Sequence, residues 1–388
     1  MNKPTYILFL LHIPPPVHGS SVVGLMIKES AIINNSFKCH YINLLASKNI
    51  AESGIINLNK LLGFVITWFK LFLSVIRHRP KLCHMALSTT GVAFFKDILL
   101  IALLKIFRIK RIYHLHNKGV RLHQHKAIYH ICYKFVFRNA EVILLSNLLY
   151  SDIQAFVPHF KVHICPNGIP NLVPNSNLYT SPKEVQIQNF QHQSSDQKQL
   201  HDPNKIVQIL FLSNLIETKG VYVLLDACTL LKKKEILFKC IFVGGEGEIT
   251  YSRFYERVNQ LELMQQVSYL GEKYGIEKYK LFSDSDIFVF PTYYETFGLV
   301  NLEAMQHSKP IISTIEGGIP DIIEDGINGF LIPTKDPIAL ANKLEVLIQN
   351  SNLRQQMGAA GRKKYEQEFT LAKFENRLTE ILKKVASN

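Results

Sequence analysis

Residues 291–305 read PTYYETFGLVNLEAM, and this stretch decides how the rest of the chain is interpreted. A β-rich apolar run ends where the stretch begins, a polar loop carries Glu295, and a helical pattern starts just after Gly298. Glycine lets the backbone approach a ligand closely. The free N–H groups of Gly298, Leu299 and Val300 at a helix start suit an anion such as phosphate. The stretch therefore predicts a strand, a loop and a helix that bind a phosphate-bearing ligand.

Two glutamates lie on either side of the predicted helix start. Glu303 lies about one turn inside the helix, where its carboxylate can accept two hydrogen bonds from a vicinal diol such as a ribose. Glu295, in the loop ahead, can reach a different part of the same ligand. Alternatively, both are ordinary helix-start acids that the helix dipole favours. Spacing alone does not choose between the two interpretations.

Three other strand-end loops have composition suited to phosphate. Residues 213–220, SNLIETKG, bring Lys219 to the start of a helix, where an ammonium can neutralise a phosphate as a point charge. The loop at Gly19 can also present N–H groups, although alone it is a weak signal. Residues 242–248, FVGGEGE, lack the GxGxxG spacing, and the sequence holds no GxxxxGK[ST]. These two facts argue against a dinucleotide fingerprint and a P-loop.

Strand and helix patterns alternate through two parts of the chain, residues 1–170 and residues 205–369. Such alternation predicts parallel sheets with helices on both faces. Residues 171–204 are rich in Asn, Gln, Ser, His and Pro and are predicted to be a linker or insertion. A chain of 388 residues fits two domains. We therefore expect two α/β domains in tandem, with a ligand where the carboxyl ends of their strands face a cleft.

The charge of the chain is concentrated in its first part. Residues 1–170 hold 20 Lys and Arg against 5 Asp and Glu, whereas residues 171–388 hold 24 against 26. The asymmetry indicates an anionic partner for the first domain, either nucleic acid or an anionic membrane. No recognised nucleic-acid motif occurs. Six cysteines without a CxxC pair argue against a zinc module or disulfide framework and fit a reducing cytosol.

The apolar run at residues 61–76 has two main interpretations, and a membrane span is a third, less favoured one. It is shorter than the ~20 residues that a membrane span needs, and it contains Lys70. It is therefore either a helix that faces the core or a helix on a membrane surface, with Trp68, Phe69 and Phe72 at the interface. The N-terminal apolar run is broken by prolines and does not predict a signal peptide.

Two polar clusters raise the question of a metal. Asp284 and Asp286 resemble a metal-binding DxD, but a polar residue ahead of a strand can simply end the preceding helix. No other carboxylate is nearby in the sequence to complete a magnesium site. His114 and His116 are two apart at a strand end and point to the same face. A zinc site would need further ligands, so we expect structural histidines or a catalytic or substrate-binding histidine, and no metal.

The sequence resembles family 4 retaining glycosyltransferases of the type that builds bacterial surface polysaccharides. Residues 291–305 carry the resemblance, with the family's two glutamates separated by seven residues. KPII at 309–312, EGGIPD at 316–321 and DGING at 325–329 extend it. The match is specific over about residues 205–370 and looser in the first half.

The resemblance implies the GT-B fold, in which two Rossmann-like domains face each other across a cleft. Residues 1–170 would form the acceptor-side domain, and residues 205–369 the domain that binds a nucleotide sugar. The last helix, about residues 370–388, would cross back to the first domain. The family needs no divalent metal, and no cofactor is expected besides the nucleotide-sugar substrate.

Roles for individual residues follow from the same resemblance. Lys219 would bind the donor diphosphate, Glu303 the ribose, and Glu295 the transferred sugar. Gly19 would lie against the phosphates, and His116 would lie near the reacting sugar. The remaining donor contacts would come from backbone N–H groups of Phe297, Gly298, Leu299 and Val300.

One position departs from the family. An arginine usually stands five residues before the lysine, and here that residue is Asn214. One expected positive charge is therefore missing beside the diphosphate. Either another basic residue replaces it, or the donor binds more weakly, or the chain is not fully active.

The resulting expectation is a metal-independent, hexosyltransferase-like enzyme. It would move a sugar from a nucleotide-diphosphate sugar to a glycan or lipid-linked acceptor in polysaccharide biosynthesis. It would be cytoplasmic and peripheral on the inner face of a membrane, without a nucleic-acid partner. The alternatives are a GT-B sugar-nucleotide epimerase, a phosphorylase with a pyridoxal cofactor, and a non-catalytic basic binding module.

Overall fold

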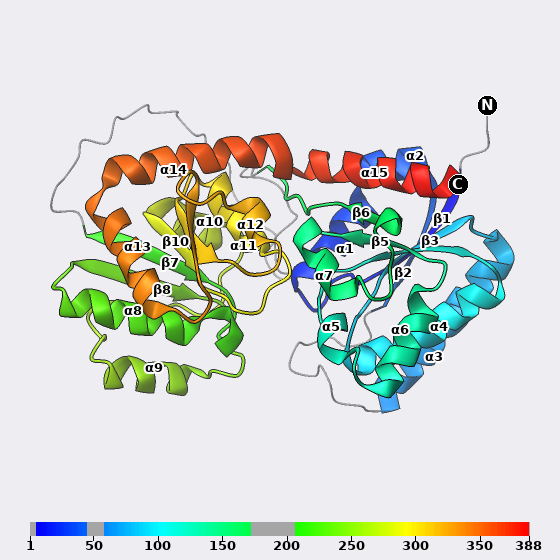
Figure 1. The fold of residues 1–388 in the computed structure, drawn as a ribbon, viewed down its shortest axis with the longest axis horizontal. Helices are drawn as coiled ribbons and strands as arrows, with labels where there is room; N and C mark the ends of the chain where they lie inside the picture. Colours follow the sequence, from blue (N-terminus) through cyan, green and yellow to red (C-terminus); the bar gives the residue numbers. More distant parts are fainter. Residues whose placement is uncertain (1–4, 45–57, 172–205, 388) are drawn as a thin grey trace.

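The computed structural model describes residues 5–44, 58–171 and 206–387, and the side chains of α3 from residue 62 onward (Figure 1). Within these ranges, two domains each contain a parallel six-stranded sheet with helices on both faces. The prediction of two Rossmann-like α/β domains is confirmed. The segment expected to be a linker, residues 171–204, lies outside the described residues except for Asn171.

The first sheet has the order β2-β1-β3-β4-β5-β6. Its strands are β1 (Tyr6–Leu11), β2 (Lys38–Asn43), β3 (Leu82–Ala86), β4 (Lys110–His114), β5 (Glu141–Leu144) and β6 (Val162–Ile164). The second sheet has the order β12-β11-β10-β7-β8-β9. Its strands are β7 (Val207–Leu212), β8 (Phe238–Val243), β9 (Val267–Tyr269), β10 (Ile287–Phe290), β11 (Ile311–Thr314) and β12 (Gly329–Ile332).

The strand order fixes where ligands are expected. In the first sheet the order reverses between β1 and β3, and in the second between β7 and β10. Open parallel sheets bind ligands at such switch points, outside the carboxyl ends of the strands. Strand β1 reads YILFLL and is buried from its second residue onward, because helices cover both faces of the sheet.

The helices of the first domain precede or follow these strands in turn. They are α1 (Gly19–Glu29), α2 (Ala31–Ser36), α3 (Leu58–His78), α4 (Gly91–Ile106), α5 (Val120–His123), α6 (Ala127–Phe137) and α7 (Tyr150–Ile153). The second domain contains α8 (Val221–Lys233), α9 (Tyr251–Gln260), α10 (Gly275–Asp284), α11 (Leu299–Gln306), α12 (Ile319–Ile322), α13 (Pro337–Gln349) and α14 (Ser351–Lys364). Within the described ranges, none of the helices has the length and apolarity needed to cross a bilayer.

The final helix, α15 (Leu371–Ser387), returns to the first domain (Figure 1). The crossing begins at a short parallel bridge, where the Ile169 N–H donates to the Phe369 carbonyl at 3.0 Å. The Leu371 N–H donates back to the Ile169 carbonyl at 2.8 Å. Apolar side chains of α15, including Phe374 and Leu378, then pack into the same core as β1. The C-terminal helix thereby ties the two domains together.

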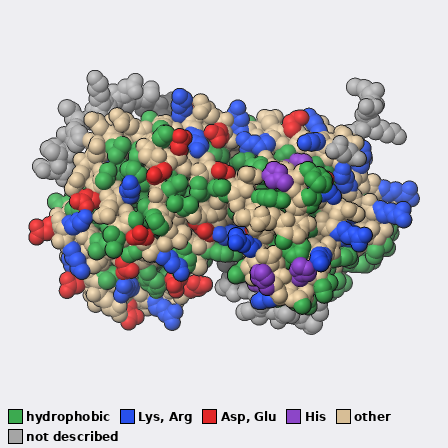
Figure 2. Space-filling view, in the orientation of Figure 1, with side chains coloured by type: hydrophobic (Ala, Val, Ile, Leu, Met, Phe, Trp, Pro, Cys, Tyr) green, Lys and Arg blue, Asp and Glu red, His purple; other side chains and the backbone are tan. Residues whose placement is uncertain are grey.

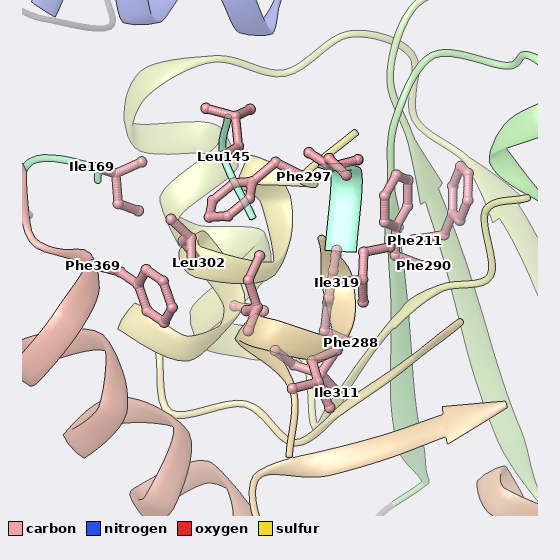
Figure 3. Close-up of a cluster of buried hydrophobic side chains, with 14 of the residues drawn as sticks. Leu145, Ile169, Phe211, Phe288, Phe290, Phe297, Leu302, Ile311, Ile319 and Phe369 are labelled. Atoms are coloured by element: carbon pink, nitrogen blue, oxygen red, sulfur yellow. The ribbon is translucent and has the colours of Figure 1, made fainter. Parts of the chain in front are cut away.

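A hydrophobic cluster reinforces this junction (Figure 3). Leu145 and Ile169 of the first domain lie beside Phe297, Leu302 and Phe369 of the second part of the chain. All five side chains are buried. Phe297 belongs to the stretch that precedes α11 and forms the predicted site. The same hydrophobic cluster therefore packs the domain junction together and holds this part of the predicted site in place.

Candidate functional site

The loops at the carboxyl ends of the two sheets meet at the junction between the domains. Tyr294, after β10, donates its hydroxyl hydrogen to the Lys118 carbonyl after β4, at 2.9 Å. Gly19, after β1, lies against α11, since a Cβ placed on it would be 3.8 Å from Leu299 Cδ1. The loops at the strand ends of the two domains are therefore neighbours in space.

Lys219 and Glu295 form the centre of the candidate site. Lys219 Nζ lies 2.8 Å from Glu295 Oε2 and 3.4 Å from the Tyr294 carbonyl oxygen. The other carboxylate oxygen of Glu295 accepts from the N–H groups of Thr296 at 2.8 Å and Phe297 at 3.4 Å. Both charged side chains remain partly exposed. The arrangement holds a lysine and a carboxylate ready to exchange partners with a charged ligand.

Gly220 makes this position of Lys219 attainable. Its φ of +85° is left-handed, and an added Cβ would lie 2.1 Å from the Pro291 carbonyl oxygen. A side chain at position 220 would therefore force apart the loops after β7 and β10. With glycine there, the short 3₁₀ turn Glu217–Lys219 lies directly against the loop that carries Glu295.

Helix α11 begins at Gly298, which has a φ of +85°. No described side chain caps this helix start. The Asn301 N–H donates to the Gly298 carbonyl at 3.0 Å. The N–H groups that precede it have no acceptor within the helix, as at any helix N-terminus, and are suited to an anion.

Glu303 projects from α11 and has one paired and one unpaired oxygen. Its Oε1 lies 2.9 Å from Nζ of Lys278 on α10. Its Oε2 is buried and has no hydrogen-bond partner among the described residues. A buried acceptor left unpaired costs about 1–3 kcal/mol. This carboxylate thus has the capacity to accept a hydrogen bond from a ligand hydroxyl.

Three charged residues belong to this neighbourhood although the sequence analysis did not assign them. Glu316 forms an ion pair with Lys118 across the domain junction and accepts from the Glu295 N–H at 3.1 Å. Lys278 is the partner of Glu303. Glu316 lies within the motif EGGIPD, and that motif was the available signal. The two lysines lie in stretches without a recognisable motif, so only the fold reveals their partners.

Asn214, which stands where the family usually has an arginine, carries no charge and forms a hydrogen bond within its own domain. Its Oδ1 accepts from the Gly245 N–H at 3.0 Å, which closes the glycine-rich turn after β8. This hydrogen bond holds the Asn214 side chain against the turn that follows β8.

His116 is part of a group of histidines at the carboxyl ends of the first sheet. Its ring centroid lies 4.1 Å from that of His114, whose Nδ1 lies 3.3 Å from His84 Nε2. Burial, together with the neighbouring imidazoles of His12, His84 and His18, lowers the pKa of His116 to about 3. The ring is therefore neutral near pH 7 and can accept or donate one hydrogen bond.

The two aspartates of the DxD pattern have separate positions. Asp284 is the last residue of α10. Asp286 Oδ2 accepts from the Gln208 N–H at 2.8 Å and so supports the start of β7. Among the described residues, no cluster of three His, Cys, Asp or Glu side chains is arranged to hold a metal ion.

Sequence comparison relates the second half of the chain to a known family. Residues 192–364 match the family described as "Glycosyl transferases group 1". Over 234 residues the chain is 26% identical to a D-inositol 3-phosphate glycosyltransferase of Corynebacterium diphtheriae, covering 59% of this chain and 53% of the relative. It is also 26% identical over 194 residues to the Staphylococcus aureus capsular polysaccharide biosynthesis glycosyltransferase CapM, covering 50% of each chain. The chain thus spans about half the length of these curated relatives.

Solved structures extend the likeness over the whole fold. HepE of Anabaena, in complex with UDP and glucose, superposes with a TM-score of 0.68 at 20% identity, covering 97% of this chain and 99% of that one. Sucrose-phosphate synthase of Thermosynechococcus elongatus gives a TM-score of 0.71 at 16% identity, covering 99% of both chains. At these identities the comparison establishes the fold.

Proposed function

We propose that this protein, which has the GT-B fold and resembles group 1 glycosyltransferases, is a retaining glycosyltransferase that uses a nucleotide-diphosphate sugar. Its acceptor would be a lipid-linked glycan of a surface polysaccharide. The observation that carries the proposal is the Lys219–Glu295 pair beside the uncapped start of α11. A lysine, a helix N-terminus and a second carboxylate on the same helix together match the phosphates and ribose of a nucleotide.

The departure of a nucleoside diphosphate requires stabilisation of negative charge. As the bond from the anomeric carbon to the phosphate oxygen breaks, charge develops on the diphosphate. Lys219 would move from Glu295 to the diphosphate, and the N–H groups at Gly298, Leu299 and Val300 would donate to its oxygens. Prearranged donors of this kind are often the largest catalytic contribution. Metal would then be unnecessary.

The two glutamates would divide the recognition of the donor. Glu303 would accept from the ribose hydroxyls through the oxygen that lacks a protein partner. Glu295, once released by Lys219, would accept from hydroxyls of the transferred sugar. Gly19 lies next to Leu299 and would let the first domain close over the phosphates without steric conflict.

Retention of configuration would follow from attack on the face that the diphosphate leaves. The acceptor oxygen would bond to the anomeric carbon, and its proton would pass to the departing diphosphate. No protein nucleophile is then needed. Neutral His116 would hydrogen-bond the reacting sugar from the first domain. Alignment of the two substrates between closed domains would supply the remaining rate enhancement.

The names of similar proteins guide the choice of substrate. HepE was crystallised with UDP-glucose, and CapM acts in capsular polysaccharide biosynthesis according to its name. We therefore propose UDP-sugars as the first donors to test. The basic first domain would face the inner surface of the cytoplasmic membrane, where lipid-linked acceptors are available.

Equilibrium binding of nucleoside diphosphates tests the donor assignment without knowledge of the acceptor. Calorimetric titration of the full chain with UDP, GDP and ADP in the absence of metal should show saturable binding of at least one. Lys219→Ala should weaken that binding by about 10- to 100-fold while the thermal unfolding curve stays unchanged. Absence of binding for all three, or equal binding by the variant, would contradict the donor site.

A further inference from the structure

A pocket of about 400 Å³ lies between the edge strand β2 and helix α3. It is in the first domain, and none of its lining residues belongs to the candidate donor site. Pockets of this size are large enough to bury part of a small ligand. The pocket is therefore a candidate for a second binding site on the molecule.

The lining of the pocket is basic. Lys70, Arg77, His40 and His78 contribute to it, and none of the described lining residues is acidic. Neither Lys70 nor Arg77 forms an ion pair with any described residue. Lysine supplies a point charge and arginine a planar fork of donors, and both recognise phosphate oxygens. The pocket thus has the charge of an anion site.

Ser74 adds a second, independent indication of a ligand. This residue lines the pocket and is only 4% exposed. Its hydroxyl has no hydrogen-bond partner among the described residues. Buried hydroxyl groups are normally satisfied. A ligand oxygen in the pocket would supply the missing partner.

An apolar stripe runs along the outer face of α3, next to this pocket. Its residues recur at helical spacing and are 46–60% exposed: Leu62, Val65, Ile66, Phe69, Leu73 and Ile76. Leu73 also lines the pocket. Lys70 and Arg77 each directly follow a residue of the stripe, so cationic groups border it. This combination is typical of a helix that lies in a membrane interface.

Neighbouring helices continue the apolar surface. Helix α4 packs beside α3 and exposes Val92, Leu99 and Ile106. Helix α6 packs beside α4 and exposes Ile128 and Ile131 (Figure 1). So many large exposed apolar side chains on adjacent helices indicate an interaction surface.

The charge around these helices selects the partner. Residues 58–138 contain 15 Lys and Arg but a single acidic residue, Asp97, and that side chain is buried. Figure 2 shows many Lys and Arg side chains on the first domain, with hydrophobic side chains at its lower edge. An apolar surface bordered by cations complements an anionic bilayer, whereas nucleic acid would leave the apolar stripe exposed to water.

We propose that the pocket between β2 and α3 binds the phosphate headgroup of an anionic membrane lipid, while the apolar stripe of α3 enters the bilayer interface. The inference rests on the proposed function, because an enzyme with a lipid-linked acceptor must reach the membrane that holds it. Lys70, Arg77 and the Ser74 hydroxyl would contact the phosphate, and Phe69 and Leu73 would contact the acyl chains.

Co-sedimentation of the full chain with vesicles tests the proposal. The wild type should bind vesicles that contain phosphatidylglycerol and remain in the supernatant with phosphatidylcholine alone. Lys70→Glu combined with Arg77→Glu should weaken binding at least about tenfold, a loss of about 1.4 kcal/mol. Ser74→Ala should weaken it less. The matched control, Lys233→Glu with Lys363→Glu, makes the same charge change at exposed positions of the second domain and should bind as the wild type does.

Three results would overturn the proposal. They are no sedimentation of the wild type at low salt, an equal loss in the control variant, and binding of inorganic phosphate or DNA without binding of vesicles. Nucleoside diphosphate titration of the same variants separates this proposal from the donor site. If the wild type binds a nucleoside diphosphate but no vesicles, the lipid pocket alone is rejected, whereas vesicle binding without nucleotide binding rejects the donor site alone. Loss of vesicle binding with intact nucleotide binding in Lys70→Glu with Arg77→Glu is the expected result.

Discussion

The Lys219 ammonium and the Glu295 carboxylate lie 2.8 Å apart. Each residue thereby satisfies the charge of the other. A diphosphate would compete with Glu295 for Lys219, and the transferred sugar would occupy the carboxylate that is released. The pair therefore links the binding of the diphosphate to the exposure of the sugar-binding group.

Substitutions at this pair should have opposite effects on nucleotide binding. Lys219→Ala removes a charged hydrogen-bond donor and should weaken nucleoside diphosphate binding by about 10- to 100-fold. Glu295→Gln removes the competitor for Lys219, so the diphosphate should bind at least as tightly, while sugar transfer falls. Calorimetry and a turnover assay measure the two effects. Equal weakening of binding in both variants would contradict competition at Lys219.

The role of Glu303 can be separated from that of Lys219 with two ligands. Glu303→Ala should weaken nucleoside diphosphate binding but leave inorganic pyrophosphate binding unchanged, because pyrophosphate has no ribose. Lys219→Ala should weaken both. Competition titration gives the affinities, and Lys278→Ala controls for loss of the 2.9 Å pair with Glu303. If Glu303→Ala weakens pyrophosphate binding as strongly, Glu303 acts on the phosphates and the ribose assignment is wrong.

Transfer activity should survive chelation of divalent ions. Charge neutralisation is assigned to Lys219 and the start of α11, and Asp286 already accepts from the backbone of β7. Turnover in excess EDTA should match turnover with added Mg²⁺ or Mn²⁺. Loss of activity in EDTA that Mg²⁺ or Mn²⁺ restores would instead favour Asp284 and Asp286 as ligands.

The buried histidines should make stability depend on pH. Burial lowers the pKa of His84 to about 3, below the ordinary value of 6.5 that it regains on unfolding. Between these values the unfolded chain binds more protons, so stability is complete above pH 6.5 and falls as the pH drops toward 3. One such group contributes a slope of up to about 1.4 kcal/mol per pH unit. His84→Gln, which keeps a polar group beside His114, should reduce the slope by about this amount.

Urea denaturation at several pH values between about 4.5 and 7.5 measures this slope. Asp97 opposes the histidines, because burial raises the pKa of its carboxyl to about 7. The unfolded chain has the ordinary aspartate pKa of 3.8 at this position. The contribution of Asp97 to stability is therefore present below pH 3.8 and falls as the pH rises from 3.8 toward 7. Asp97 is present in both His84→Gln and the wild type, so the difference between their two slopes does not contain its contribution. Identical slopes in the two proteins would show that His84 does not stay neutral in the folded state.

The sequence predicts the fold because strand and helix patterns alternate through both halves of the chain, although strands β2 and β12 are not among the predicted strands. Strand β1 is continuously apolar since both faces of the sheet are covered, and the loops after β7 and β10 carry glycines where the chain turns closely. The contact between Lys219 and Glu295 depends on β7 lying beside β10, a strand order that the residue patterns do not contain. Pairs such as Lys118–Glu316 join loops of different domains and emerge only from tertiary structure.

Helix α3 shows why one local pattern allowed two interpretations. Leu71 and Val75 are fully or almost fully buried against the first sheet, whereas Phe69 on the other side is 54% exposed. Trp68 and Phe72 are partly buried and pack against the core. Of the three aromatic side chains that the membrane-surface interpretation places at an interface, only Phe69 is exposed. The helix has one face in the core and a second apolar face that is exposed. Its average hydrophobicity therefore could not decide between a helix that faces the core and a helix on a membrane surface.

The measurement that tests the central claim most directly is turnover of nucleotide sugars with a lipid extract as the acceptor. We predict that the wild type releases nucleoside diphosphate from at least one of them without added metal, and only when the extract is present. Lys219→Ala should not do so. NMR of the product should show that the new linkage keeps the anomeric configuration of the donor. Absence of acceptor-dependent release from every nucleotide sugar, or a product with inverted configuration, would contradict the account.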